Sequence, residues 1–132
     1  MEKANKDFCE FIKDRISKTN RRNSNCAGTA LYIVGELEED GVINKSKSKE
    51  ILSNLKRDFS PEKGYIVYWG LDGVPFHIGV ILDELPLMVV HRSGNNGLLI
   101  KDSLDELNSY LFKHTELRPI YKIPSKLESF LI

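Results

Sequence analysis

The chain has 132 residues, and its 19 basic and 19 acidic side chains give a formal net charge of zero at pH 7. This length is that of one ordinary domain and is enough to build a substantial hydrophobic core. An apolar fraction of 41% excludes a low-complexity disordered chain. The charge balance does not favour a nucleic-acid-binding protein, which would carry a basic excess. We therefore predict a single domain over residues 1–132.

The sequence predicts neither a membrane span nor an export signal. No apolar stretch reaches the roughly 18 residues that a membrane-spanning helix needs. The start of the chain, MEKANKDFCEFIKDR, carries charges every few residues and lacks the apolar core of a secretory signal. We expect a protein that is cytoplasmic, or secreted without a recognisable signal peptide. The two cysteines, Cys9 and Cys26, are too few for a disulfide framework, and a bond between them is expected only in an oxidising compartment.

A first helix is predicted from Lys6 to Lys18, because four apolar residues recur there at helical spacing: Phe8, Phe11, Ile12 and Ile16. Cys9 lies beside this stripe and is interpreted as a small core residue. The next segment, residues 18–25, contains no apolar residue and predicts a loop.

A second helix is predicted over residues 26–37, where the sequence CAGTALYIVGEL is apolar on most of the helix circumference. A helix of this kind is buried within a domain. Ser24 and Asn25 precede it, and both residue types commonly cap the open backbone amides of a first helical turn. Cys26 is therefore predicted to begin a buried helix.

The next segments are charged. Residues 36–40 and 45–49 are expected to face solvent. Residues 47–59 predict a surface helix, with an inner side formed by Ile51, Leu52, Leu55 and Phe59. This helix is expected to end before the turn residues Pro61 and Gly64.

Short strand-like runs follow Gly64, at residues 65–69, 76–82, 87–91 and 98–101. Turn signals separate them closely, which favours antiparallel meander connections. Ser103 and Glu106 form a capping-box pattern that opens a helix to Phe112, and a last strand is predicted over residues 117–123. Helices followed by an antiparallel sheet give the α+β class.

Three residues could carry chemistry together: Cys26, His77 and His91. A helix N-terminus and a neighbouring imidazolium both favour the reactive thiolate, which Cys26 requires as a nucleophile. His77 is the candidate base, and Gly79, two residues later on the same strand face, leaves room for the Cys26 helix to approach. His91 ends the next strand, where it can hold the His77 ring if the two strands pair.

Each of these residues also has a simpler interpretation. A histidine in a strand is more often structural, and a lone cysteine in a helix is usually an inert core residue. A metal site built from Cys9, Cys26, His77 and His91 is disfavoured, because their spacing lacks the short pairs of zinc sites. We predict no metal and no cofactor.

Other polar and aromatic residues are given ordinary roles. Trp69 is interpreted as a core residue, with a cleft wall as the alternative. His114 is expected to face solvent. Ser93, Asn95 and Asn96 lie in a loop after His91, where turn chemistry explains them, although such a loop can also touch a substrate.

Four short motifs, taken in order, resemble the NlpC-type cysteine peptidases of the papain-like superfamily. They are Asn25-Cys26-Ala27-Gly28 at the start of a buried helix, Lys63-Gly64 before YIVYW, Phe76-His77-Ile78-Gly79-Val80, and Val90-His91. The resemblance covers roughly Ser24 to Arg92. Asn25, Ala27 and Tyr65 stand where the family pattern has Asp, Ser and Asp.

The resemblance implies a papain-like (NlpC-type) fold, with N-terminal helices packed on a small antiparallel sheet. Cys26 would be the nucleophile, His77 the general base and acid, and His91 the residue that orients His77. The implied activity is hydrolysis of an amide bond through an acyl-thioester, on a peptide or peptidoglycan fragment, without nucleic acid or membrane span. Two alternatives stay open: a non-catalytic peptide- or acyl-binding module, and an acyltransferase or deamidase that uses the same triad. The sequence makes no prediction about oligomeric state.

Overall fold

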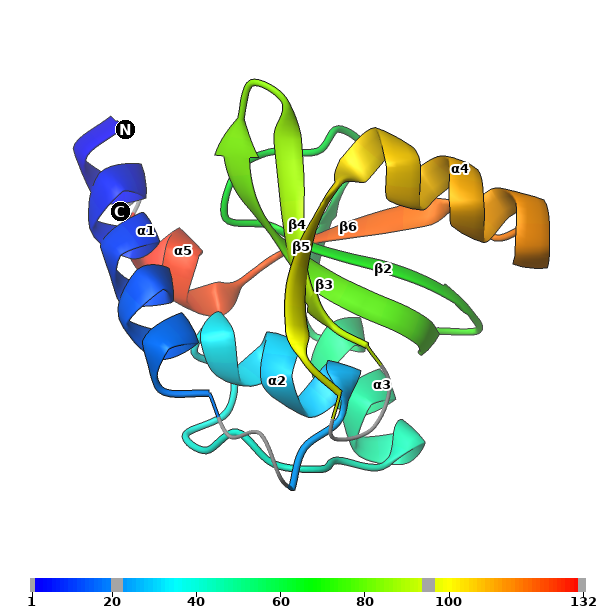
Figure 1. The fold of residues 1–132 in the computed structure, drawn as a ribbon. Helices are drawn as coiled ribbons and strands as arrows, with labels where there is room; N and C mark the ends of the chain where they lie inside the picture. The colour runs from blue at the N-terminus through cyan, green and yellow to red at the C-terminus, as the bar shows by residue number, and fades with distance from the viewer. Residues whose placement is uncertain (1, 20–22, 94–96, 131–132) are drawn as a thin grey trace.

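The structure is a computed structural model that describes residues 2–19, 23–93 and 97–130 (Figure 1). The described residues form helices packed around a six-stranded antiparallel sheet, which confirms the predicted α+β class. The helices are α1 (Glu2–Ser17), α2 (Cys26–Ile33), α3 (Lys45–Ser53), α4 (Leu104–Thr115) and α5 (Ser125–Phe130). The strands are β1 (Lys56–Asp58), β2 (Ile66–Leu71), β3 (Val74–Glu84), β4 (Leu87–Arg92), β5 (Leu99–Ser103) and β6 (Pro119–Ile123).

The strand order across the sheet is β1-β6-β2-β3-β4-β5. Strands β2 to β5 pair with their chain neighbours in antiparallel register, so the predicted meander is confirmed. β6 then returns across the sheet and inserts between β1 and β2. The turn between β2 and β3 is tight because Asp72 and Gly73 both adopt positive φ angles, of 54° and 77°.

Helices lie on both faces of the sheet. Trp69 on β2 donates from its indole Nε1 to Asn108 Oδ1 at 3.0 Å, which fixes α4 on the face that Trp69 shares with its cross-strand partner His77. Arg92 on β4 donates to Thr29 of α2 at 2.7 Å, so α2 lies on the opposite face. Figure 1 shows α4 on one side of the sheet and α2 on the other, with α1 beside α5. The sheet therefore stands between the two helices that matter for the site.

The predicted helix over residues 26–37 is shorter than expected, since α2 ends at Ile33. Gly35 adopts a φ of +87°, and the chain turns there. The amides of Gly35 and Glu36 donate to the carbonyls of Tyr32 and Leu31, at 3.1 and 2.9 Å. This is the Schellman pattern, in which glycine closes a helix by adopting a left-handed conformation.

The predicted helix over residues 47–59 is wrong in its second half. α3 ends at Ser53, and Lys56–Asp58 form the edge strand β1, which pairs with β6. Leu52 and Leu55 are buried as predicted, whereas Phe59 is 80% exposed. The pairing partner of β1 comes more than sixty residues later, so the local pattern could not reveal the strand.

Two differences concern the last third of the chain. α4 begins after Ser103 as predicted, with the Ser103 hydroxyl accepting from the Glu106 amide at 3.0 Å, and it runs three residues beyond Phe112. The short helix α5 was not predicted. It packs against α1, where Leu127 is buried. Among the described residues, no helix combines the length and the apolar character that crossing a membrane would take.

Candidate functional site

Cys26 is the first residue of α2, as predicted, and Asn25 is the N-cap. The Asn25 side chain accepts from the Gly28 amide at 2.8 Å, and its Nδ2 donates to the Ile43 carbonyl at 2.9 Å. The cap therefore satisfies one backbone amide of the first turn and also ties the helix to the chain ahead of α3. The Cys26 side chain is half-buried, and neither cysteine is in a disulfide.

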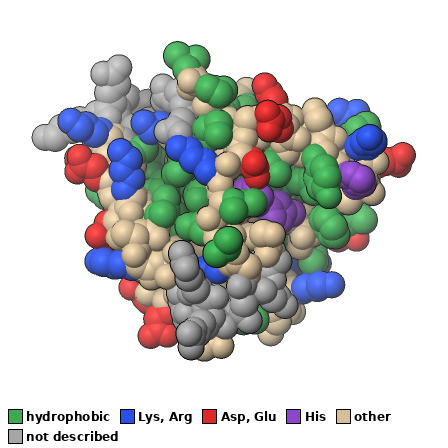
Figure 2. Space-filling view, viewed as in Figure 1, with side chains coloured by type: hydrophobic (Ala, Val, Ile, Leu, Met, Phe, Trp, Pro, Cys, Tyr) green, Lys and Arg blue, Asp and Glu red, His purple; other side chains and the backbone are tan. Residues whose placement is uncertain are grey.

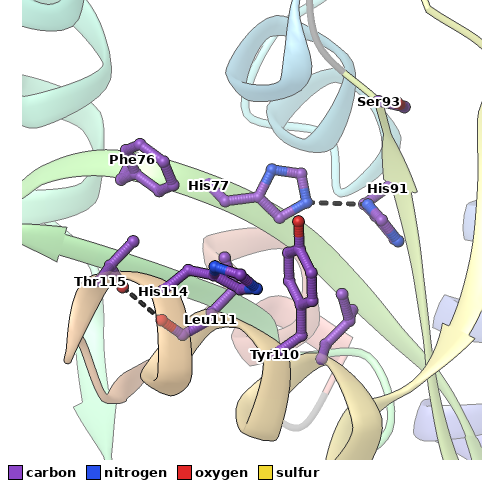
Figure 3. A pocket seen from close by; sticks show the side chains of 9 residues that line it. Phe76, His77, His91, Ser93, Tyr110, Leu111, His114 and Thr115 are labelled. Carbon is purple, nitrogen blue, oxygen red and sulfur yellow. Dashed lines mark hydrogen bonds between the residues drawn. The ribbon is translucent and has the colours of Figure 1, made fainter.

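His77 and His91 lie together, as predicted, and a third residue extends the contact. His77 Nε2 lies 2.8 Å from His91 Nδ1, and His91 Nε2 lies 2.9 Å from Asp102 Oδ2 (Figure 3 draws the first of these contacts). The two imidazole rings meet edge to face, with centroids 4.8 Å apart. The three side chains come from β3, β4 and β5.

Asp102 was not singled out in the sequence. Its carboxylate reaches His91 because Val89 of β4 pairs with Asp102 of β5, which puts both residues and His91 on one face. Only the register between these strands identifies the contact between Asp102 and His91. The amino-acid sequence around residue 102 does not predict it. The His91 side chain is 6% exposed and that of Asp102 is 42% exposed.

Gly79 has a different role from the predicted one. A Cβ at this position would lie 2.8 Å from the Val90 carbonyl oxygen and 3.1 Å from His91 Cβ. The close approach is therefore made by β4, not by the Cys26 helix. Because Gly79 has no side chain, the neighbouring strand β4 can lie close to β3 at this point, where His91 reaches His77.

Helix α2, which begins at Cys26, packs against β3. Backbone hydrogen bonds to the thiol of Cys26 come from Ala27, from Cys26 itself and from Ile78, the residue that follows His77 on β3. The described β3–β4 ladder ends at the pair Val80–Val90. Among the described residues no hydrogen bond joins the Cys26 thiol to the His77 ring, because α2 lies on one face of the sheet and the His77 side chain lies on the other.

The contacts fix where the protons of the two histidines lie. A carboxylate only accepts hydrogen bonds, so His91 Nε2 carries the proton toward Asp102. In a neutral His91, Nδ1 is then an acceptor, and His77 Nε2 must donate to it. His77 therefore keeps Nδ1 unprotonated, which is the state that a general base needs.

Burial changes the pKa of both candidate catalytic groups. Burial raises the pKa of the Cys26 thiol above its ordinary value, and the backbone hydrogen bonds from Ala27, Cys26 and Ile78 lower it only in part. Burial lowers the pKa of His77 to about 4, with a smaller contribution from the neighbouring His91. Both shifts run against the thiolate and the imidazolium that the sequence favours, and they favour a neutral thiol and a neutral imidazole at neutral pH.

The pKa of His77 predicts a pH-dependent stability. The unfolded chain binds a proton at His77 with the ordinary pKa of 6.5, and the folded chain only with a pKa of about 4. The free energy of unfolding should fall as the pH drops from 6.5 toward 4, by up to about 3 kcal/mol. Urea unfolding at about pH 7 and pH 4.5 should show this loss in the wild type and a smaller one in His77→Gln. Equal pH dependence in the two proteins would contradict the assignment.

A buried ionic network lies on the opposite face of β4 and holds the start of α2. Arg92 is 1% exposed and donates from Nη2 to Asp40 Oδ2 at 3.3 Å, from Nε to Thr29 Oγ1 at 2.7 Å, and from Nη1 to the Gly97 carbonyl at 2.6 Å. Thr29 and Ser24 also bind Asp40. The expectation that Asp40 faces solvent is wrong, because its carboxylate neutralises the buried guanidinium.

The other residues that the sequence singled out differ in how deeply they are buried. Trp69 is fully buried, which confirms the core interpretation. Cys9 is half-buried on α1. His114 is exposed as expected, and its ring packs against that of Tyr110 in a tilted arrangement, with 4.4 Å between ring centroids. Asn95 and Asn96 lie outside the described residues. Among the residues that the structure describes, no group of His, Cys, Asp and Glu side chains could hold a metal ion.

A cavity of about 400 Å³ opens beside the histidine pair. The lining residues come from β3, β4, the chain after β4, and α4; they are Phe76, His77, His91, Ser93, Leu107, Tyr110, Leu111, His114 and Thr115. Figure 2 shows histidine side chains on this face of the molecule, with hydrophobic side chains around them. The histidine pair is therefore accessible to a small molecule from the side of α4.

Comparison with known proteins gives no relative. The chain matches no model of a known protein family, and a search of curated proteins finds no match. The function therefore has to be argued from the residues and their geometry.

Proposed function

We propose that the protein is a cysteine-dependent amide hydrolase with an NlpC-like, papain-like fold. The observation that carries the proposal is the chain of contacts from His77 through His91 to Asp102, and the thiol that begins α2 is the nucleophile that we assign to it. A nucleophile, a base and a group that orients the base are the parts that covalent acyl transfer requires. Peptide or peptidoglycan-fragment amides are the substrate class that the sequence resemblance suggests.

The proposed reaction has two steps. Cys26 Sγ attacks the carbonyl carbon while its proton moves to His77 Nδ1, and the tetrahedral intermediate expels the amine after His77 returns this proton to the leaving nitrogen. The product is an acyl-thioester. Water then attacks the thioester carbonyl and gives a proton to His77, which passes it to the departing sulfur. The carboxylic acid leaves and the thiol is restored.

The resting protonation states of Cys26 and His77 suit the two proposed reaction steps. Because His77 has a pKa of about 4 it is neutral at pH 7, and because the pKa of Cys26 is raised the thiol keeps its proton until the attack. Proton transfer therefore accompanies bond formation. The backbone amides at the start of α2 are suited to stabilise the oxyanion, as such donors do in other acyl-transfer sites.

A trapped intermediate tests the proposal. The protein is mixed with an activated acyl ester, quenched in acid and digested, and the peptide that contains Cys26 is weighed by mass spectrometry. We expect an acyl group on Cys26 and none on Cys9. Absence of any acyl group on Cys26 would favour the non-catalytic binding module. Transfer of that acyl group to an added amine, in preference to water, would favour an acyltransferase.

Replacing Asp102 provides a sharper test of the contacts that join His77, His91 and Asp102. Asn at this position can donate to His91 Nε2, which reverses the proton order and places a proton on His77 Nδ1. We expect Asp102→Asn to lower kcat by about 100-fold, less than the loss in a fully buried triad because the carboxylate is 42% exposed. Initial rates measure the effect. Asp105→Asn, an exposed carboxylate on α4, is the matched control, and equal rates for both variants would contradict the role of Asp102.

A further inference from the structure

Two cavities adjoin each other on the face of the sheet that α4 covers. The first, of about 400 Å³, contains the ring of His77. The second has a volume of about 430 Å³, and its lining residues come from β4, β5 and α4. Both cavities are lined by His91, Leu107 and Tyr110, so they meet at these three side chains. We call the two cavities together the α4 groove.

The end of the α4 groove beside His77 is apolar and aromatic. The rings of Phe76 and Tyr110 line it and are exposed, at 63% and 61%. Leu107 and Leu111 also line it and are buried. In Figure 3, Tyr110 extends from α4 toward the histidine pair. None of the described residues that line this end bears a carboxylate, an ammonium or a guanidinium group. An aromatic or aliphatic group would therefore leave water for apolar contacts there.

The other end of the α4 groove is lined by two carboxylates, those of Asp102 and Glu106. Asp102 is 42% exposed, and its Oδ2 lies 2.9 Å from His91 Nε2. Glu106 is exposed. In the described part of the chain, no lysine or arginine forms an ion pair with either carboxylate. A protonated His91 would neutralise only one of the two charges. This end of the groove therefore attracts a cation.

The position of Glu106 in the first turn of α4 gives its charge a simpler role as well. Negative side chains near a helix N-terminus interact favourably with the helix dipole, and both Asp105 and Glu106 lie there. The dipole accounts for the sign of the charge on α4. It does not account for the meeting of Glu106 with the carboxylate of Asp102, from β5, at one cavity that Asp105 does not line.

We infer that the α4 groove binds a small organic cation, an ammonium ion that carries an aromatic or bulky apolar group. The ammonium lies beside Asp102 and Glu106, and the apolar group lies in the cavity beside His77. The carboxylates select the charge, because an ion pair in a partly enclosed site is stronger than one in bulk water. The aromatic lining selects the group that the cation carries. The inference goes beyond the proposed hydrolase function and requires no contact with Cys26.

Three ligands of similar shape and different charge test the inference: phenethylammonium, phenethyl alcohol and hydrocinnamate. The wild-type protein is titrated with each ligand at neutral pH, and the imidazole signals of His77 and His91 are followed by NMR. We expect the ammonium to bind at least about tenfold more tightly than the alcohol, and the carboxylate to bind most weakly. Equal affinities for the ammonium and the alcohol would overturn the inference, and so would an absence of saturable binding.

The charged end is tested by Glu106→Gln, which keeps the backbone amide that binds Ser103. We expect the affinity for phenethylammonium to fall by about tenfold, and that for phenethyl alcohol to stay within about twofold. The unchanged alcohol affinity shows that the groove is intact. Asp105→Asn is the matched control, because it removes a charge from the same helical turn outside the groove lining. Equal losses in the two variants would mean that the cation responds to the charge of α4 alone, which would overturn the inference.

The apolar end is tested with ethylammonium, which has the charge without the ring. We expect it to bind the wild type at least about tenfold more weakly than phenethylammonium. Tyr110→Ala should remove most of this difference, and Tyr110→Phe should keep it, because the ring remains. Phe112→Ala is the control, since Phe112 is 45% exposed on α4 and packs against Arg118 outside the groove lining. An unchanged ratio of the two affinities in Tyr110→Ala would contradict the assigned position of the ring.

Discussion

Replacing Cys26 with alanine is expected to abolish amide hydrolysis, with kcat/KM falling by at least about 10⁴-fold. The proposed reaction forms its covalent bond at this sulfur, and an alanine methyl group offers no atom that could replace it. Initial rates on a peptide amide substrate measure the loss. Because the helix cap is made by Asn25 and not by the thiol, the variant should fold with an unchanged free energy of unfolding, within about 1 kcal/mol.

Cys9→Ala is the matched control for this experiment. Cys9 is the other thiol of the chain, half-buried on α1, and its replacement should leave kcat/KM within about twofold of the wild type. Retention of more than about a tenth of the activity in Cys26→Ala would remove the nucleophile from the proposal. A comparable loss in Cys9→Ala would mean that the rate reports folding and not chemistry.

Replacing Asp40 with alanine is expected to lower the free energy of unfolding by about 3–5 kcal/mol, which is among the largest effects a single substitution has. The change leaves the guanidinium of Arg92 buried, at 1% exposure, without the carboxylate that neutralises it. It also removes an acceptor from Ser24 and Thr29. Urea unfolding followed by circular dichroism measures the loss.

Glu39→Ala provides the comparison for Asp40→Ala. Glu39 is the preceding residue and is exposed, so its loss should change the free energy of unfolding by less than about 0.5 kcal/mol. If Asp40→Ala destabilises too strongly to be measured at 25 °C, Asp40→Asn keeps one hydrogen-bonding oxygen and should show a smaller loss of the same sign. Equal stability of the Asp40 and Glu39 variants would contradict the buried ion pair.

The sequence predicts best what is local. The cap at Asn25, the N-cap at Ser103 and the meander of β2 to β5 all follow from residues close together in the chain, and the structure confirms them. The contact between His77 and His91 was also predictable, because it needs only that two successive strands pair. The α3–β1 boundary was not, since β1 is a strand only by virtue of its pairing with β6.

The parts of the site that the sequence missed depend on burial and on register. Asp40 stands in an acidic run and has the pattern of an exposed residue. It is buried because it forms an ion pair with Arg92, far along the chain. Asp102 reaches His91 only through the register of β4 on β5. A helix N-terminus favours a thiolate at Cys26, but the desolvation that outweighs it can be judged only once the surrounding atoms are known.

The close packing of β4 beside Gly79 has a consequence for the order in which the proposed site is assembled. His91 contacts His77 only after β4 has packed beside that glycine. The hydrogen bond that orients His91 forms only after β5 has added Asp102. During synthesis the segment with Cys26 emerges long before these strands. Under the proposed mechanism, a nascent or misassembled chain therefore carries the thiol without its base, and the base is in place only when the sheet is complete.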